Sequence, residues 1–230
     1  MRKVAVVFSA FLLICLVTSA ASAATISLFE WTLNVNGTIY TPGDTPPGSG
    51  TLDLAGTGLG TWTVSHTAVG LELYFVTLFV DHEIDEALNT FFNEFGSVAG
   101  APAAGQRWEI DEPGYVFGDI YDNVLAGGQA LDDLNGVPSA KPDDVSMAMS
   151  WNFLLAAGET ATAKFLLSET APTGGLYLQH TDPDSDANIY FSGSASIQGG
   201  GGPTIPEPGT IALVLSGLGL VAASRFRKSA

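Results

Sequence analysis

The residues whose spacing most suggests chemistry are three aspartates in the last third of the chain. Asp182, Asp184 and Asp186 occupy alternate positions, which would let their carboxylates converge on a hard cation such as calcium. A calcium loop would continue with glycine and end on a glutamate, whereas Ala187 and Asn188 follow here. Aspartate and proline also form turns between strands. The sequence therefore leaves two interpretations open: a structural turn, which the missing closing ligand favours, and a weak calcium site.

A second pattern with chemical meaning is His82-Glu83, which matches the first half of a zinc-protease motif. In that motif a second histidine follows one helical turn later, so that both imidazoles face the metal. Position 86 is glutamate, and the other two histidines, His66 and His180, are distant in sequence. We therefore expect an acidic transition from strand to loop and no metalloprotease site.

No other pattern predicts catalytic residues. The chain has neither a Gly-x-Ser-x-Gly elbow nor a glycine loop that could hold phosphate after a strand. Gly56, Gly58 and Gly60 alternate with other residues but precede no helix start, so we expect turn or strand-edge glycines. With 24 acids, some carboxylates will be neighbours by chance, whereas a glycosidase also needs a cleft and a raised pKa. We predict that the protein is not an enzyme.

Exposed aromatic side chains could bind sugar rings by stacking. The chain has four tryptophans, Trp31, Trp62, Trp108 and Trp151. Trp62 and Trp151 fit the inward alternation of their segments and are expected in the core. Trp108 lies between Arg107 and Glu109 and is the candidate for an outward side chain that stacks on carbohydrate.

The elements that carry these residues are predicted to be strands, because apolar and polar residues alternate with a period of two. The alternating segments include 145–153, 163–167, 176–178 and 189–191, together with regions around Ile26, Leu28, Trp31 and Leu33 and around Trp62 and Val64. Segment 71–80 is apolar on both faces, as expected of a strand that is covered on both sides. Loops such as 42–48 and 135–138 lie between the strands.

Roughly eight to eleven short strands between residues 24 and 198 predict a single all-β domain, a two-sheet, jelly-roll-like sandwich. Helical content should be low. The best helix candidate is 85–92, with an irregular loop as the alternative. About 180 residues are enough for one hydrophobic core without disulfides.

The net charge is −16, from 24 acids and 8 basic residues. Five of the eight basic residues lie close to the two ends, while every acid lies between Glu30 and Glu207. The strongly acidic middle excludes a nucleic-acid binder, which needs a cationic surface. It also argues against docking of this part of the chain onto anionic lipid.

Residues 1–23 are typical of a secretory signal peptide. Arg2 and Lys3 precede a short apolar run, and Ala21-Ser22-Ala23 is a small-x-small cleavage site. We predict export by the Sec machinery and cleavage between Ala23 and Ala24, which would remove Cys15, the only cysteine. A retained anchor is the alternative, but the run is shorter than the ~20 residues that span a bilayer.

The C-terminal segment has four parts in order. A glycine-rich linker at 199–204 precedes Pro206, Glu207 and Pro208, then an apolar run at about 209–224 and the basic residues Arg225, Arg227 and Lys228. As a helix the run would reach ~22 Å, a marginal span of a hydrocarbon core of ~30 Å. The basic residues should stay in the cytoplasm, which leaves the β domain outside.

This arrangement at 205–230 resembles the PEP-CTERM sorting signal of Gram-negative bacteria. The resemblance implies that exosortase recognises Pro206, Glu207 and Pro208 and cleaves nearby, and it implies a link to exopolysaccharide and biofilm. Ile205 and the interrupting Phe226 are small departures from the usual pattern. Segments 81–96 and 143–192 also look like a recurring type of PEP-CTERM ectodomain, for which no activity is implied.

We therefore expect an exported protein that is anchored in the inner membrane by its C-terminal helix and then delivered to the cell surface or extracellular matrix. Its expected role is structural or interactive and linked to exopolysaccharide or biofilm, with no cofactor and no nucleic acid. The alternatives are a carbohydrate-binding module with extracellular polysaccharide as partner, a calcium-dependent adhesion module and a hydrolase.

Overall fold

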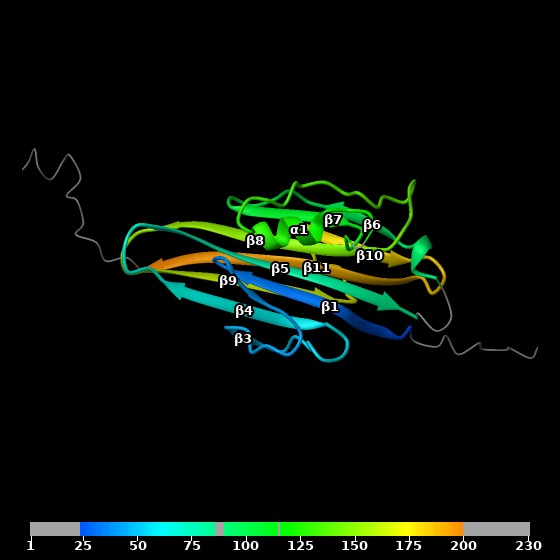
Figure 1. The fold of residues 1–230 in the computed structure, drawn as a ribbon, viewed down its shortest axis with the longest axis horizontal. Helices are drawn as coiled ribbons and strands as arrows, with labels where there is room; N and C mark the ends of the chain where they lie inside the picture. Colours follow the sequence, from blue (N-terminus) through cyan, green and yellow to red (C-terminus); the bar gives the residue numbers. More distant parts are fainter. Residues whose placement is uncertain (1–23, 86–89, 115, 200–230) are drawn as a thin grey trace, which may run out of the picture.

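The computed structural model describes residues 24–85, 90–114 and 116–199, which form two facing antiparallel sheets (Figure 1). The first sheet has the order β2 (Thr38–Tyr40), β1 (Ile26–Val35), β5 (Glu72–Ile84), β8 (Ser146–Leu155) and β7 (Gln106–Asp111). The second has the order β3 (Ser49–Gly50), β4 (Gly60–Thr67), β9 (Glu159–Ser168), β11 (Ala187–Gly199), β10 (Tyr177–Asp182) and β6 (Phe95–Ala99). The predicted all-β, two-sheet architecture is confirmed.

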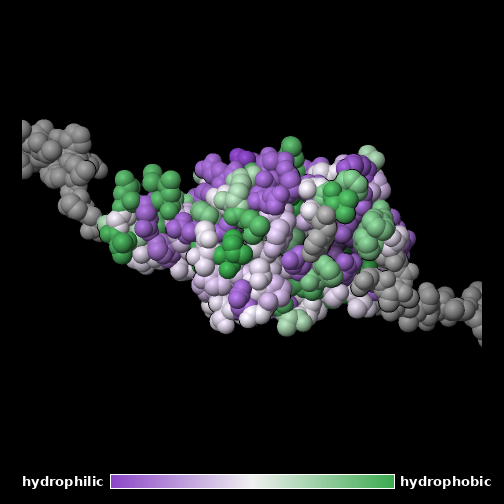
Figure 2. Space-filling model, viewed as in Figure 1, coloured by the Kyte–Doolittle hydropathy of each residue, from purple (hydrophilic) through white to green (hydrophobic). Residues whose placement is uncertain are grey.

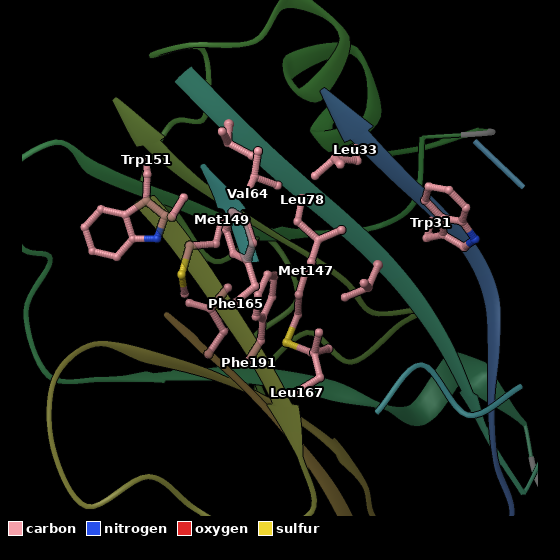
Figure 3. Close-up of a cluster of buried hydrophobic side chains, with 14 of the residues drawn as sticks. Trp31, Leu33, Val64, Leu78, Met147, Met149, Trp151, Phe165, Leu167 and Phe191 are labelled. Carbon is pink, nitrogen blue, oxygen red and sulfur yellow. The ribbon is translucent and has the colours of Figure 1, made fainter. Parts of the chain in front are cut away.

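The main core fills the space between the sheets, as the period-two alternation predicts. Leu78 and Met147 from the first sheet meet Phe165 and Phe191 from the second (Figure 3), and all four are buried. The rings of Phe165 and Phe191 lie 6.0 Å apart. The predicted inward residues of β8, β9, β10 and β11 are confirmed.

A short helix, α1 (Ile120–Ala126), covers the outer face of β5 and β8. Its buried residues Ile120 and Val124 join a second core cluster with Phe79 and Ala148. The polar residues of β8 are therefore buried too, and Ser150 accepts a hydrogen bond from Thr77 Oγ1 at 2.9 Å. This helix was not predicted, because seven residues give too little periodicity to distinguish a helix from a loop.

The helix expected at 85–92 is not found in the described part of that segment. Asp85 has a positive φ of 52°, which ends β5 rather than starting a helix. A single 3-10 turn, η1 (Phe91–Asn93), follows, and its first turn is capped by Thr90. Residues 86–89 lie outside the described residues.

The prediction that 71–80 is covered on both faces is correct only for the second half of the segment. Residues 76–82 are continuously buried, because α1 covers their outer face. Leu71 and Leu73, in contrast, are 79% and 76% exposed, since nothing among the described residues packs over that end of β5.

The two ends of the sandwich differ, and we name them by what they carry. The end formed by Gly199, the 68–71 loop and the 156–158 loop is called the tail end, because β11, the last described strand, ends there (Figure 1). The opposite end carries the start of β1, the end of β5 and the β10–β11 turn, and is called the groove end. Of the helices in the described residues, none is long and apolar enough to cross a membrane.

Candidate functional site

Most of the predicted sorting and processing residues lie outside the described residues. These are the motif Pro206, Glu207 and Pro208, the basic flank Arg225, Arg227 and Lys228, the predicted transmembrane segment and the signal peptide up to Ala23. Ala24 is the first described residue and is half-buried at the groove end.

The three alternating aspartates form the tight turn between β10 and β11. Asp182 is fully buried, and its carboxylate accepts hydrogen bonds from the backbone of Asp184 at 2.9 Å and of Ser185 at 3.2 Å. Asp184 accepts a hydrogen bond from Asn93 Nδ2 at 2.8 Å, and Asp186 adopts a left-handed φ of 58°. This geometry supports the structural-turn interpretation; calcium binding at these residues stays a prediction.

His82 lies within β5, whereas the zinc-protease motif presents its histidines on a helix. Its imidazole is 1% exposed and sits against Gly58, whose position leaves no room for a side chain. Burial, reinforced by the nearby His180, lowers the pKa of His82 to about 3. The ring is therefore uncharged at neutral pH.

A groove of about 610 Å³ opens at the groove end of the sandwich. Its walls come from four places: β1 and β5, the η1 turn, the segment after β7, and the segment before β8. The lining residues are Phe29, Asp81, Glu83, Phe91, Phe92, Glu112, Pro113, Gly114, Val116, Phe117, Asp143 and Asp144. Aromatic and acidic side chains thus make up most of the lining.

Exposed phenylalanines form the rim of the groove. Phe29, Phe92 and Phe117 are 61%, 63% and 67% exposed, and the ring of Phe91 lies 4.2 Å from that of Phe92. Phe29 projects outward because β1 has a bulge there: Leu28 pairs with His82 and Glu30 with Asp81, which leaves Phe29 without an opposite residue. Bulges of this kind commonly redirect a side chain next to a functional site.

Carboxylates form the floor of the groove. Asp81 is 1% exposed, and its Oδ1 has no hydrogen-bond partner among the described residues. Burial, and next the charge of Asp144, raises the pKa of Asp81 well above its ordinary value. Burial also raises the pKa of Asp144, although His180 opposes that shift. Glu112 is 7% exposed and lies 3.6 Å from the ammonium group of Lys141.

A buried pair lies close behind this floor. Glu94 Oε2 is 2.6 Å from His180 Nε2, and neither residue is exposed. The backbone carbonyl of Glu94 accepts a hydrogen bond from Asp143, a residue of the groove, at 3.0 Å. The groove floor is thus connected to the pair through the segment that precedes β8.

The tryptophans do not form a carbohydrate platform. Trp31 and Trp151 are each 4% exposed, as expected of core residues. Trp62 is half-buried against the core, and its Nε1 donates to the carbonyl of Pro47 at 3.1 Å. Trp108 is also half-buried against the core, so the expectation that it points outward is wrong. Its place in β7, beside the buried strand β8, accounts for this.

A separate acidic cluster could hold a cation. Within the described ranges, Glu109, Asp111 and Asp119 offer oxygens that lie within 4.8 Å of one another. Both oxygens of Glu109 already accept hydrogen bonds from Asn123 Nδ2 at 3.1 Å. Burial raises the pKa of Glu109 to about 7. Protein donors therefore already contact both carboxylate oxygens of Glu109, the most buried member of this cluster.

Sequence reasoning missed the rim of the groove. A signal for Phe29 was present, because the apolar spacing of two residues breaks between Leu28 and Trp31, as a bulge requires. Phe92 and Phe117 belong to short irregular segments, where no periodicity reveals which side chains are exposed.

A family model of the PEP-CTERM protein-sorting motif matches residues 204–228. The chain is a PEP-CTERM protein. The motif confirms the resemblance seen in the sequence, and it indicates a protein that is exported, anchored in the membrane during sorting by exosortase, and directed to the cell envelope or surface. No curated protein and no solved structure gives a significant match to this chain.

Proposed function

We propose that the β domain of this PEP-CTERM protein binds extracellular polysaccharide through the groove, as an interaction module of the surface matrix and not as an enzyme. The observation that carries the proposal is the combination of exposed phenylalanines above a floor of carboxylates. Aromatic faces pack against the apolar faces of sugar rings, and carboxylates accept hydrogen bonds from sugar hydroxyls. Binding sites are generally concave and apolar with a few polar groups that fix orientation.

The charge of the protein narrows the class of polysaccharide. Between Ala24 and Gln198 every cluster of charge is acidic, with Arg107, Lys141 and Lys164 as the basic residues. A strongly acidic domain repels acidic polymers. We therefore expect neutral or amino-bearing polysaccharides to bind and uronic-acid polymers to bind weakly.

The test is a direct binding measurement on the full chain in detergent with neutral, amino-bearing and uronic-acid oligosaccharides. Replacing the rim residues by Phe92→Ala and Phe117→Ala together should weaken binding at least about tenfold, since each loses an aromatic contact. Leu71→Ala, at an even more exposed apolar residue of the tail end, is the control and should bind like the unmodified chain. Equal affinity of the rim variant and the control would refute the proposed function.

Hydrolysis of the bound polysaccharide is a second candidate, and one observation favours it. Asp81 combines near-complete burial with a raised pKa in a groove that other carboxylates share, as a general acid in glycoside hydrolysis requires. A time course of reducing-end release tests this candidate. If the unmodified chain releases reducing ends and Asp81→Asn abolishes this release, hydrolysis is established. If no polysaccharide that binds is cleaved, hydrolysis is refuted and binding remains the function.

A further inference from the structure

The tail end of the sandwich carries a second exposed apolar surface, far from the groove. Five side chains form it, and we call them the apolar tip: Val69, Leu71, Leu73, Leu154 and Ile197, which are 94%, 79%, 76%, 63% and 47% exposed. Figure 2, in the same view as Figure 1, shows green, hydrophobic side chains gathered at the end of the molecule where β11 ends. A group of apolar side chains at this exposure, unlike a single exposed leucine, is typical of a surface that contacts a partner or a membrane.

Strand pairing brings the apolar tip together. Leu73 of β5 lies directly opposite Leu154 of β8 in the first sheet. The loop that carries Val69 is joined to the second sheet by hydrogen bonds from Ala68 N to Glu159 O and from Gly158 N to Ala68 O, both at 2.8 Å. Ile197 lies near the end of β11, opposite Ala161. The tip therefore belongs to the rigid framework of both sheets.

The place where the domain ends puts the apolar tip close to a membrane. β11 ends at Gly199, and the apolar run that is expected to span the membrane begins at about residue 209, inside the matched sorting motif. Even a fully extended chain covers at most about 36 Å over that interval, at about 3.6 Å per residue. While the protein is anchored for sorting, the end of the domain that bears the tip cannot move farther than this from the lipid surface.

We propose that the apolar tip docks onto the lipid surface while the protein is anchored. The contact is hydrophobic, because all five residues of the apolar tip are uncharged and the domain as a whole is acidic. Docking therefore needs no anionic lipid and is weakened by it. Since the groove lies at the opposite end, docking by the tip directs the groove away from the membrane and into the surrounding matrix.

The experiment uses the full chain reconstituted in phosphatidylcholine vesicles. Cys15 is the only cysteine, so Cys15→Ser allows a single labelled cysteine to be placed at will. One variant carries an environment-sensitive fluorophore at Leu71→Cys. The matched control carries it at Asp184→Cys, in the exposed β10–β11 turn at the groove end. Nitroxide-labelled lipids then quench a fluorophore that lies at the bilayer surface.

We expect quenching at Leu71→Cys to be at least threefold stronger than at Asp184→Cys. Equal quenching at the two positions, or no association of the chain with vesicles, would overturn the proposal.

Adding Val69→Ser and Leu154→Ser should reduce quenching at Leu71→Cys at least twofold. Undiminished quenching would overturn the proposal, because the tether alone would then bring the tip near lipid. The proposal would also be overturned if the fluorescence at Leu71→Cys shifted to the blue with increasing protein density but was not quenched by the labelled lipids. A second copy of the chain would then cover the tip. Stronger quenching on added phosphatidylglycerol would contradict the hydrophobic character of the contact.

Discussion

Glu94 and His180 face each other at 2.6 Å, fully buried behind the floor of the groove. Burial raises the pKa of Glu94 and lowers that of His180, so both shifts favour an uncharged pair at neutral pH, in which the protonated carboxyl group of Glu94 donates a hydrogen bond to the neutral imidazole. Glu94 Oε1 and His180 Nδ1 have no hydrogen-bond partner in the described part of the chain. The pair is therefore held by one hydrogen bond, and the loss of its proton would leave a buried charge.

This pair makes stability depend on pH. Burial, with the charges of Asp182 and Asp144 next, raises the pKa of Glu94 from 4.5 to about 9. A raised carboxyl pKa contributes stability that is complete below about pH 4.5 and is lost as pH rises to about 9. His82 and His180, whose pKa values fall to about 3 and about 4, act in the opposite direction and lose their contribution only as pH falls below about 6.5.

Between pH 7 and 9 His82 and His180 are largely neutral in both states, so we expect the free energy of unfolding to fall with rising pH. Glu94→Gln copies the protonated form and should reduce that fall by on the order of 2 kcal/mol, at about 1.4 kcal/mol per pKa unit. Urea unfolding at pH 7 and pH 9 measures the difference in the free energy of unfolding between the two pH values. Glu169→Gln, a change at an exposed acid, is the control. An identical pH dependence in Glu94→Gln and the unmodified chain would contradict the assignment.

Gly58 is required by its contact with His82. Its φ is +66°, and a β-carbon there would lie 2.5 Å from His82 Nε2 and 2.9 Å from Leu28 Cβ. Gly58→Ala must therefore both strain the backbone and displace a buried imidazole, and we expect a loss of at least about 2 kcal/mol. Gly70, which has nothing within 4 Å of such a carbon, is the control, and Gly70→Ala should change stability by less than about 0.5 kcal/mol. Equal melting temperatures of the two variants would show that the site relaxes freely.

The parts of the fold that were predicted are those where burial repeats with a short period. Met147, Phe165 and Phe191 were predicted as inward residues because each lies in a strand with one face against the core. The helix α1 was missed because a seven-residue element is defined by tertiary packing against β5 and β8 more than by its own pattern.

The groove was missed for a related reason. Its floor residue Asp81 and its rim residue Phe92 are 11 positions apart, and Phe117 and Asp144 come from still other segments. Only the closure of the sandwich brings these four segments to the same end. Sequence alone could mark Asp143 and Asp144 as acids in a loop, but it could not show which aromatic side chains lie above them.

The sorting motif makes its own prediction. The match at 204–228 includes Pro206, Glu207 and Pro208, whose two prolines keep the backbone extended around the glutamate. Replacing all three by alanine should abolish processing, so that the chain accumulates in the membrane fraction at its unprocessed size and is lost from the cell surface. Immunoblots of cell fractions measure both effects. Normal surface delivery of this variant would contradict a role of the motif in sorting.

Two phenylalanines, one in the core and one at the rim of the groove, distinguish a role in stability from a role in polysaccharide binding. Phe165 is fully buried between the sheets, whereas Phe92 is 63% exposed at the rim of the groove. Phe165→Ala should lower the free energy of unfolding by about 3–5 kcal/mol, because it removes a large core side chain and leaves a cavity. Phe92→Ala removes a side chain that already contacts water and should cost less than about 1 kcal/mol, yet it should weaken polysaccharide binding. Urea unfolding and oligosaccharide titration of both variants separate the two roles. If the loss of affinity were proportional to the loss of stability in both variants, the phenylalanine rim would have no direct role in recognition.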